Sequence, residues 1–156
     1  MKKLFAYTLL SLFTLGFSSC LRDDKQLFDS SPATRLDAII TQEKQLLESS
    51  PQGWMLQYYA GKDYTGAGYT LLMKFENGKV SIMGDNGDPE LIATSDYDIV
   101  KDQGPVLTFP TFNAVIHPLA SASLGHPEGI QGDYEFVILE ASQDRIRLRG
   151  KKWKNE

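Results

Sequence analysis

The sequence contains few of the residues that usually build redox, metal and nucleophilic sites. Its 156 residues include one cysteine, Cys20, and two histidines, His117 and His126. A single cysteine excludes a disulfide within the chain, so stability must come from a packed core. Neither histidine has a His, Cys or carboxylate partner at the close spacing that zinc sites use. We therefore expect no metal and no cofactor.

Catalysis has little support in the sequence. No Gly-x-Ser-x-Gly motif is present, and the proline after His117 favours an extended, structural position for that histidine. One enzymatic alternative is that Asp133 and Glu135, two positions apart on a strand, act as paired carboxylates in glycoside hydrolysis. They are more simply interpreted as solvent-facing partners of Lys151 or Lys152. We favour binding over catalysis.

The charge balance is acidic, with 16 Lys and Arg against 20 Asp and Glu. Nucleic-acid binding depends on clustered basic residues, so the sequence argues against a nucleic-acid partner.

The first twenty residues have the layout of a secretion signal that ends at Cys20. Lys2 and Lys3 form the basic start, Leu4 to Phe17 form an apolar run, and two serines precede the cysteine. The apolar run is shorter than the roughly 18 residues that a transmembrane helix needs. We predict a lipoprotein signal peptide over residues 1–19 and lipidation of Cys20.

Residues 20–30 are predicted to be a tether between the lipid and one domain over residues 31–156. The charged stretch after Cys20 includes Asp23 and Asp24. It resembles the acidic signal that moves Bacteroidetes lipoproteins to the outer face of the outer membrane. We expect a lipid anchor in the outer membrane, with the domain facing the cell exterior.

Hydrophobic periodicity predicts one helix followed by strands. Ser31-Pro32 favours a helix start, and an apolar stripe at helical spacing continues to about residue 49. The period then changes to two, and Asn77-Gly78 between alternating runs predicts a hairpin with a type I′ turn. Strands are expected from Trp54, Tyr69, Val80, Tyr97, Val106, Tyr134 and Arg145 onward, with turn-rich loops at 85–90, 101–105 and 119–132.

These elements predict a mainly β (α+β) fold. One N-terminal amphipathic helix precedes an antiparallel meander of about seven strands, and the meander forms either an open barrel or a sandwich.

Aromatic and basic side chains are the candidates for ligand binding. Trp54, Tyr58 and Tyr64 offer flat faces for sugars or peptide side chains, although aromatics with a period of two are more often core residues. Arg147 and Lys151 belong to a basic strand face, which is either an anion-binding groove or a solvated edge.

The chain also resembles a family of uncharacterised Bacteroidetes surface lipoproteins that contain a domain of unknown function. Its GW-x3-YY, GPVLTF and GDYEF motifs lie in order along the chain. The segments that carry the resemblance are Phe28-Asp29, Ser31-Pro32-Ala33, Arg35-Leu36, Gly53-Trp54, Tyr58-Tyr59, Gly68-Tyr69, Lys74-Phe75, Ser95-Asp96-Tyr97, 104–109, Asn113, His117, 132–136 and 150–152.

The resemblance implies a cell-surface lipoprotein associated with outer-membrane nutrient uptake, and it adds Asn113 and His117 to the binding candidates. Family members usually continue through further β structure after Gly-Lys-Lys, so a shortened member is expected. The leading hypothesis is a glycan- or peptide-binding accessory whose partners include outer-membrane transporter proteins. The alternative is a structural or interaction subunit that pairs through an open sheet edge.

Overall fold

The computed structural model describes residues 30–122, 125, 127 and 129–156, so Cys20, His126 and the predicted signal peptide lie outside the described residues. The elements, in chain order, are α2 (Pro32–Ser49), β1 (Trp54–Tyr59), the 3-10 helix η1 (Lys62–Tyr64), β2 (Gly68–Glu76), β3 (Lys79–Gly84), β4 (Ala93–Asp96), β5 (Asp98–Asp102), β6 (Gly104–Thr108), α3 (His117–Ala120), β7 (Glu135–Ala141) and β8 (Ile146–Gly150).

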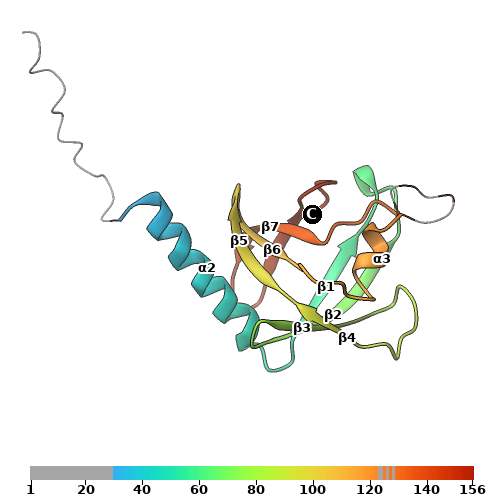
Figure 1. Ribbon diagram of the computed structural model, residues 1–156, viewed down its shortest axis with the longest axis horizontal. Helices are drawn as coiled ribbons and strands as arrows, with labels where there is room; N and C mark the ends of the chain where they lie inside the picture. Colours follow the sequence, from blue (N-terminus) through green and yellow to red (C-terminus); the bar gives the residue numbers. More distant parts are fainter. Residues whose placement is uncertain (1–29, 123–124, 126, 128) are drawn as a thin grey trace, which may run out of the picture. The chain divides into compact units, whose positions relative to one another are not determined.

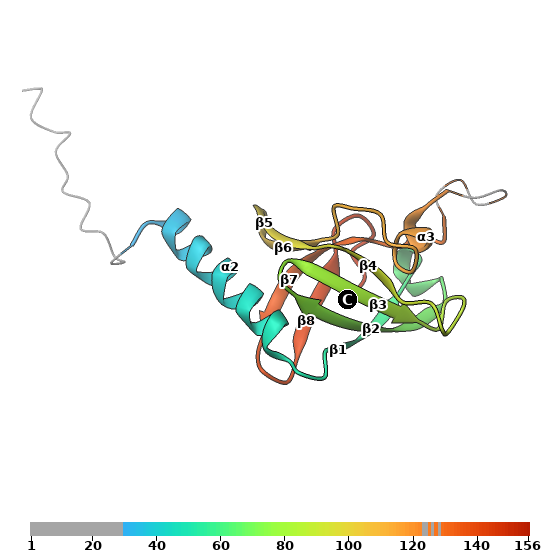
Figure 2. The ribbon, with the colours of Figure 1, turned by 60° about the horizontal axis from the view of Figure 1, so that its bottom comes forward.

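The described strands form two antiparallel four-stranded sheets. Their orders are β1-β2-β3-β4 and β5-β6-β7-β8, so each sheet follows the chain as a meander. Only Tyr97 separates β4 from β5, whereas β1 and β8 lie at the far edges and do not pair. The predicted mainly β fold with an N-terminal helix is confirmed, and the sheets are not closed into a barrel. Figures 1 and 2 show α2 across one end of the sheets and α3 at the other.

Local sequence signals explain the predicted hairpin and helix. Asn77 and Gly78 both have positive φ, 51° and 73°, as a type I′ turn requires, and they join paired residues of β2 and β3. α2 turns Ile40, Glu43 and Leu47 toward the interior at helical spacing. Both predictions are confirmed.

The structure differs from the expected elements at two places. The described residues form eight strands where about seven were expected, because Ala93–Asp96 forms β4, a segment with no apolar alternation. It pairs with β3 through its backbone, and Thr94 Oγ1 lies 2.8 Å from Ser81 Oγ on β3. The expected loop at 101–105 is a tight hairpin in which only Gln103 separates the paired Asp102 and Gly104.

The core lies between the two sheets and under α2. α2 packs on β2, β5 and β6. The side chains of this core share apolar character and almost complete burial. The largest fully buried ones in it are Phe75, Phe109, Leu71, Ile82, Leu107, Ile116 and Val80.

Candidate functional site

The candidate site is a cleft between the two unpaired sheet edges, β1 and β8. Its volume is about 570 Å³. Trp54 and Arg147, both predicted from sequence, line it from opposite walls. The other lining residues are Leu47, Met55, Leu56, Gln57, Tyr59, Met73, Phe75, Leu107, Ile138, Asp144, Arg145, Ile146, Leu148 and Glu156.

The floor of the cleft is apolar and continuous with the core. Trp54 and Leu56 from β1, and Ile146 and Leu148 from β8, are partly buried against the core cluster. The indole N–H of Trp54 donates to the Leu47 carbonyl at 2.9 Å, which fixes the ring between α2 and β1. A fixed aromatic ring beside aliphatic side chains suits apolar parts of a ligand.

The rim of the cleft carries charge. Arg147 pairs with Glu140 at 3.0 Å and with Glu156 at 2.7 Å, and the hydrogen bond to Glu156 together with both charges raises the pKa of Arg147. Arg145 is exposed, and no described residue forms an ion pair with it. Arg145 is therefore a positive group that a ligand could neutralise.

Backbone direction on β1 shows which polar groups face the cleft. In an antiparallel strand the N–H and C=O of one residue point to the same side, and successive residues alternate. Ala60 N–H bonds to the chain just before β2, whereas Tyr59 C=O accepts from the C-terminal segment on the opposite side. Met55 and Gln57 therefore direct their N–H and C=O groups away from β2 and into the cleft.

The same argument applies to β8. Lys151 N–H donates to β7 at 2.9 Å, and Gly150 N–H donates to the C-terminal segment at 2.8 Å on the other side. Alternation then directs the N–H and C=O groups of Ile146 and Leu148 away from β7. Both walls of the cleft thus present backbone groups that have no strand partner among the described residues.

The C-terminal segment closes one end of the cleft. Asn155 Nδ2 donates to the carbonyls of Tyr59 and Gly61, and Glu156 N–H donates to the Tyr64 hydroxyl at 3.3 Å. The rings of Tyr59 and Tyr64 meet edge to face at 6.2 Å. Tyr64, an exposed sequence candidate, therefore lies at this closed end and does not line the cleft itself.

Tyr58 is a core residue. Its side chain is 3% exposed, and its ring packs edge to face on Phe136 at 5.9 Å. The hydroxyl accepts from Asp133 N–H at 2.5 Å and donates to Asp133 C=O at 3.0 Å. Burial raises the pKa of Tyr58 above its ordinary value. The structure therefore places this candidate where no ligand can stack on it.

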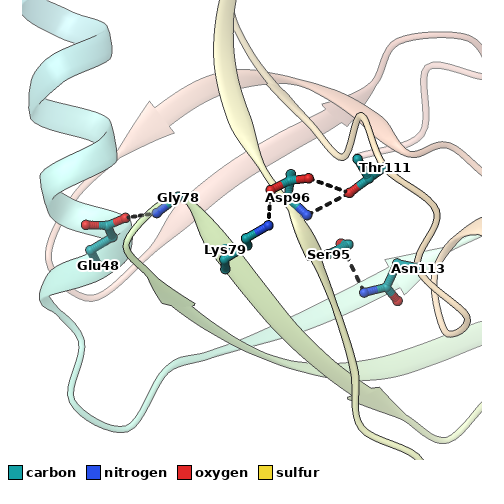
Figure 3. A network of polar contacts seen from close by, with 7 residues as sticks. All are labelled: Glu48, Gly78, Lys79, Ser95, Asp96, Thr111 and Asn113. Atoms are coloured by element: carbon teal, nitrogen blue, oxygen red, sulfur yellow. Dashed lines mark hydrogen bonds and ion pairs between the residues drawn. The ribbon is translucent and has the colours of Figure 1, made fainter.

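Asn113 is a buried connector at the β4 side of the molecule, far along the chain from the cleft strands. It is 1% exposed. Its Nδ2 donates to Ala93 C=O and to Ser95 Oγ, the second contact being drawn in Figure 3. Its Oδ1 accepts from Val115 and Ile116 N–H groups. The first two contacts attach β4 to the segment that enters α3, and the last two fix the turn of that segment.

The same figure shows a second group of polar contacts nearby. Thr111 Oγ1 accepts from Asp96 N–H at 2.8 Å and donates to Asp96 Oδ2 at 3.0 Å, and Lys79 pairs with Asp96 from β3 (Figure 3). On α2, Glu48 accepts from Gly78 N–H at 3.0 Å, which fixes the β2–β3 turn to the helix. This side of the molecule is held together by side chains.

His117 lies near Asn113 and is half-buried. Its Nδ1 accepts from Asn113 N–H at 3.1 Å, and its ring stacks on Tyr134 at 4.8 Å and meets Phe112 at 5.6 Å. Burial lowers the pKa of His117. The ring therefore serves as a neutral acceptor within an aromatic cluster.

Lys151 and the two carboxylates of the enzymatic alternative are engaged elsewhere. Lys151 Nζ pairs with Asp102 at 3.0 Å and with Glu135 at 3.3 Å. Asp133 is buried and accepts from Lys152 N–H at 2.7 Å and Trp153 N–H at 3.1 Å. Both oxygens of Asp133 hold the turn after β8, so this carboxylate is a structural group.

The described residues contain no group of three His, Cys, Asp or Glu side chains arranged to hold a metal ion. In the same part of the chain, no helix combines the length and apolar character needed to cross a membrane.

Comparison with known proteins gives one match. The family model of a domain of unknown function, DUF4302, matches residues 24–156. The chain belongs to the DUF4302 family. No curated protein and no solved structure shows significant similarity to it. Since the DUF4302 description names no activity, the function must be argued from the cleft.

Sequence reasoning missed several residues of this cleft. Met55, Gln57, Ile146 and Leu148 contribute backbone groups, which residue type does not reveal. Arg145 lies two residues before Arg147 and so extends the same basic pattern, but its lack of an ion-pair partner depends on tertiary position.

Proposed function

We propose that this chain is a lipid-anchored outer-membrane protein, facing the cell exterior, that binds a glycan or peptide in the β1–β8 cleft for a nutrient-uptake system. The observation that carries the binding role is the cleft itself, whose volume of about 570 Å³ combines an apolar floor with a charged rim. Ligand sites commonly have this size and this combination of surfaces.

The sequence supports the anchor. Cys20 follows an apolar run and two serines, and Asp23-Asp24 follows the cysteine. A lipid at Cys20 holds the domain at a membrane, where a binding cleft can deliver its ligand to neighbouring transporter proteins.

Cell fractionation tests the anchor. We expect the full chain in the outer-membrane fraction, with loss of the domain when intact cells are treated with protease. Cys20→Ala should move the protein out of the membrane fraction. Cys20→Ala protein that still sediments with membranes would show that the anchor is elsewhere.

Binding is tested with the full chain in detergent on a glycan array and on an array of synthetic octapeptides. Trp54→Ala should weaken the observed binding about tenfold because it removes the ring of the floor. Phe112→Ala is the matched control, since Phe112 is 70% exposed and does not line the cleft. Absence of binding on both arrays would contradict the binding function.

A further inference from the structure

We infer that the ligand is an extended peptide that adds to the open edge of β1 as a further strand. This inference rests on the proposed function and narrows its ligand class. It starts from the hydrogen-bonding groups of β1. Met55 and Gln57 each direct one N–H and one C=O into the cleft, and no described residue accepts or donates to these groups. Their spacing is that of alternate residues in a strand, which an extended peptide matches.

The cleft prevents this edge from being filled by the protein's own sheet. β8 forms the opposite wall, but it pairs only with β7. It also turns unpaired groups of Ile146 and Leu148 toward the same space. A peptide strand between the walls therefore has hydrogen-bonding groups on both sides. The alternating N–H and C=O groups of an extended peptide match this edge residue by residue, so the backbone edges favour a peptide over a glycan.

The floor and rim define the side chains that the peptide carries. Alternate side chains of an extended peptide point to opposite faces. One set would rest on Trp54, Leu56 and Leu148, which are apolar and partly buried. The other set would face the rim, where Arg145 has no ion-pair partner among the described residues. The favoured peptide alternates apolar residues with at least one Asp or Glu.

The test uses the full chain in detergent and acetylated, amidated octapeptides in which apolar residues alternate with Asp. Matched peptides carry Lys in place of Asp. We expect the Asp series to bind about fivefold more tightly, because the exposed Arg145 forms no ion pair with a described residue and would attract Asp and repel Lys. Arg145→Gln should remove this preference.

Backbone pairing is tested by Gln57→Pro against Gln57→Ala. Proline removes the N–H that faces the cleft and leaves the bonds to β2 intact, whereas alanine keeps the N–H. We expect Gln57→Pro to weaken peptide binding about tenfold and Gln57→Ala to change it less than about twofold. Equal effects of the two variants would overturn strand addition.

A second measurement applies if Gln57→Pro does not fold. The wild-type chain is titrated with two versions of the best peptide, N-methylated on odd or on even residues. Strand addition predicts that at least one version loses binding about tenfold or more, since methylation removes the bonding N–H groups. Unchanged binding of both versions would overturn the inference.

The remaining outcomes separate this inference from the proposed function. Glycan binding that Trp54→Ala weakens, without peptide binding, would overturn the peptide inference and leave the binding function standing. Absence of both would overturn both. A concentration-dependent dimer that Gln57→Pro abolishes would identify a second copy of the chain as the occupant, and this would also overturn the inference.

Discussion

The two places where the sheets of this protein meet or face each other are built differently. On the β4–β5 side, Tyr97 alone joins the sheets, and Asn113 donates two hydrogen bonds to β4 and accepts two from its own segment. On the β1–β8 side, the edges do not pair and a cleft of about 570 Å³ separates them. On the β4–β5 side, buried side chains form hydrogen bonds with backbone groups. On the β1–β8 side, backbone groups of both edge strands have no strand partner and can bond to a ligand.

This difference shows where a function can be sought. Buried polar groups in folded proteins normally have partners, and an exposed strand edge invites pairing. On the β4–β5 side, which we call the closed side, polar residues such as Asn113 and His117 make internal contacts that stabilise the fold. The β1–β8 side, which we call the open side, leaves the backbone groups of Met55 and Gln57 beside an apolar floor, so the proposed binding belongs to this side.

The largest loss of stability is expected from removing the Asn113 hydrogen bonds on the closed side. Asn113→Ala should lower the free energy of unfolding by about 3 kcal/mol, since it leaves Ala93 C=O and Val115 N–H buried without partners. Thermal and denaturant unfolding of the full chain measure this. Asn86→Ala is the control, because the half-buried Asn86 donates one bond to Val115 C=O, and a loss of about 1 kcal/mol is expected. Equal losses would contradict the bridging role of Asn113.

The next effect concerns Glu43 on the buried face of α2. Glu43 is 9% exposed, its Oε2 has no hydrogen-bond partner, and burial raises its pKa from 4.5 to about 7. A raised pKa in the folded state means that stability falls as pH rises from about 4.5 to 7. Glu43→Gln should therefore stabilise the protein by about 2–3 kcal/mol at pH 8.

Below pH 4.5 the Glu43→Gln and wild-type proteins should converge, because Glu43 is then protonated in both the folded and unfolded states. Glu48→Gln is the control with the opposite sign. The hydrogen bond from Gly78 N–H lowers the pKa of Glu48, so its contribution is present above 4.5 and is lost as pH falls. Unfolding measured from pH 4 to 8 distinguishes the two. A Glu43→Gln effect that does not depend on pH would contradict a titrating buried carboxyl.

A smaller effect is expected where the C-terminal segment leaves β8. Asp133→Asn replaces one carboxylate oxygen with an amide NH2 group, which cannot accept the hydrogen bond that a backbone N–H now donates there. The substitution should lower the free energy of unfolding by about 2 kcal/mol. Glu135→Gln disrupts only a partly exposed pair with Lys151 and should cost less than about 1 kcal/mol. Chemical denaturation of both variants compares them. Similar small costs would mean that Asp133 is free for another role.

The smallest effect is expected from loosening the closed end of the cleft. Asn155→Ala removes the bonds to Tyr59 and Gly61 carbonyls and should cost about 1 kcal/mol. It also frees Tyr59 C=O to accept a hydrogen bond from a ligand, so octapeptides should bind about twofold more tightly. Calorimetric titration checks this, and unchanged stability together with unchanged binding would show that the segment does not cover the edge.

Much of the fold could be predicted from the sequence because its signals are local. The helix follows from the spacing of Ile40 and Leu47, and the hairpin follows from the positive φ that Asn77-Gly78 accepts. β4 was missed because Ser95 and Thr94 are polar. Their place in a sheet depends on Ser81 and Asn113, which lie 13 and 18 residues away in the chain.

The candidate site could be predicted only in part, because tertiary position separates residues of the same pattern. Trp54 and Tyr58 alternate on one face of β1, yet Tyr58 lies under Phe136 while Trp54 lines the cleft. Arg147 and Lys151 share a basic pattern, but only Arg147 lines the cleft. The open edge itself depends on which strands pair, and residue type does not encode that.

Amide hydrogen exchange along β1 and β8, measured by NMR on the full chain in detergent without ligand, tests the open side most directly. The N–H groups of Met55, Gln57, Ile146 and Leu148 should exchange at least about tenfold faster than those of Leu56, Tyr58, Arg147 and Arg149, which point to β2 or β7. Equal protection along both strands would show that the edges are paired, and it would contradict the binding cleft.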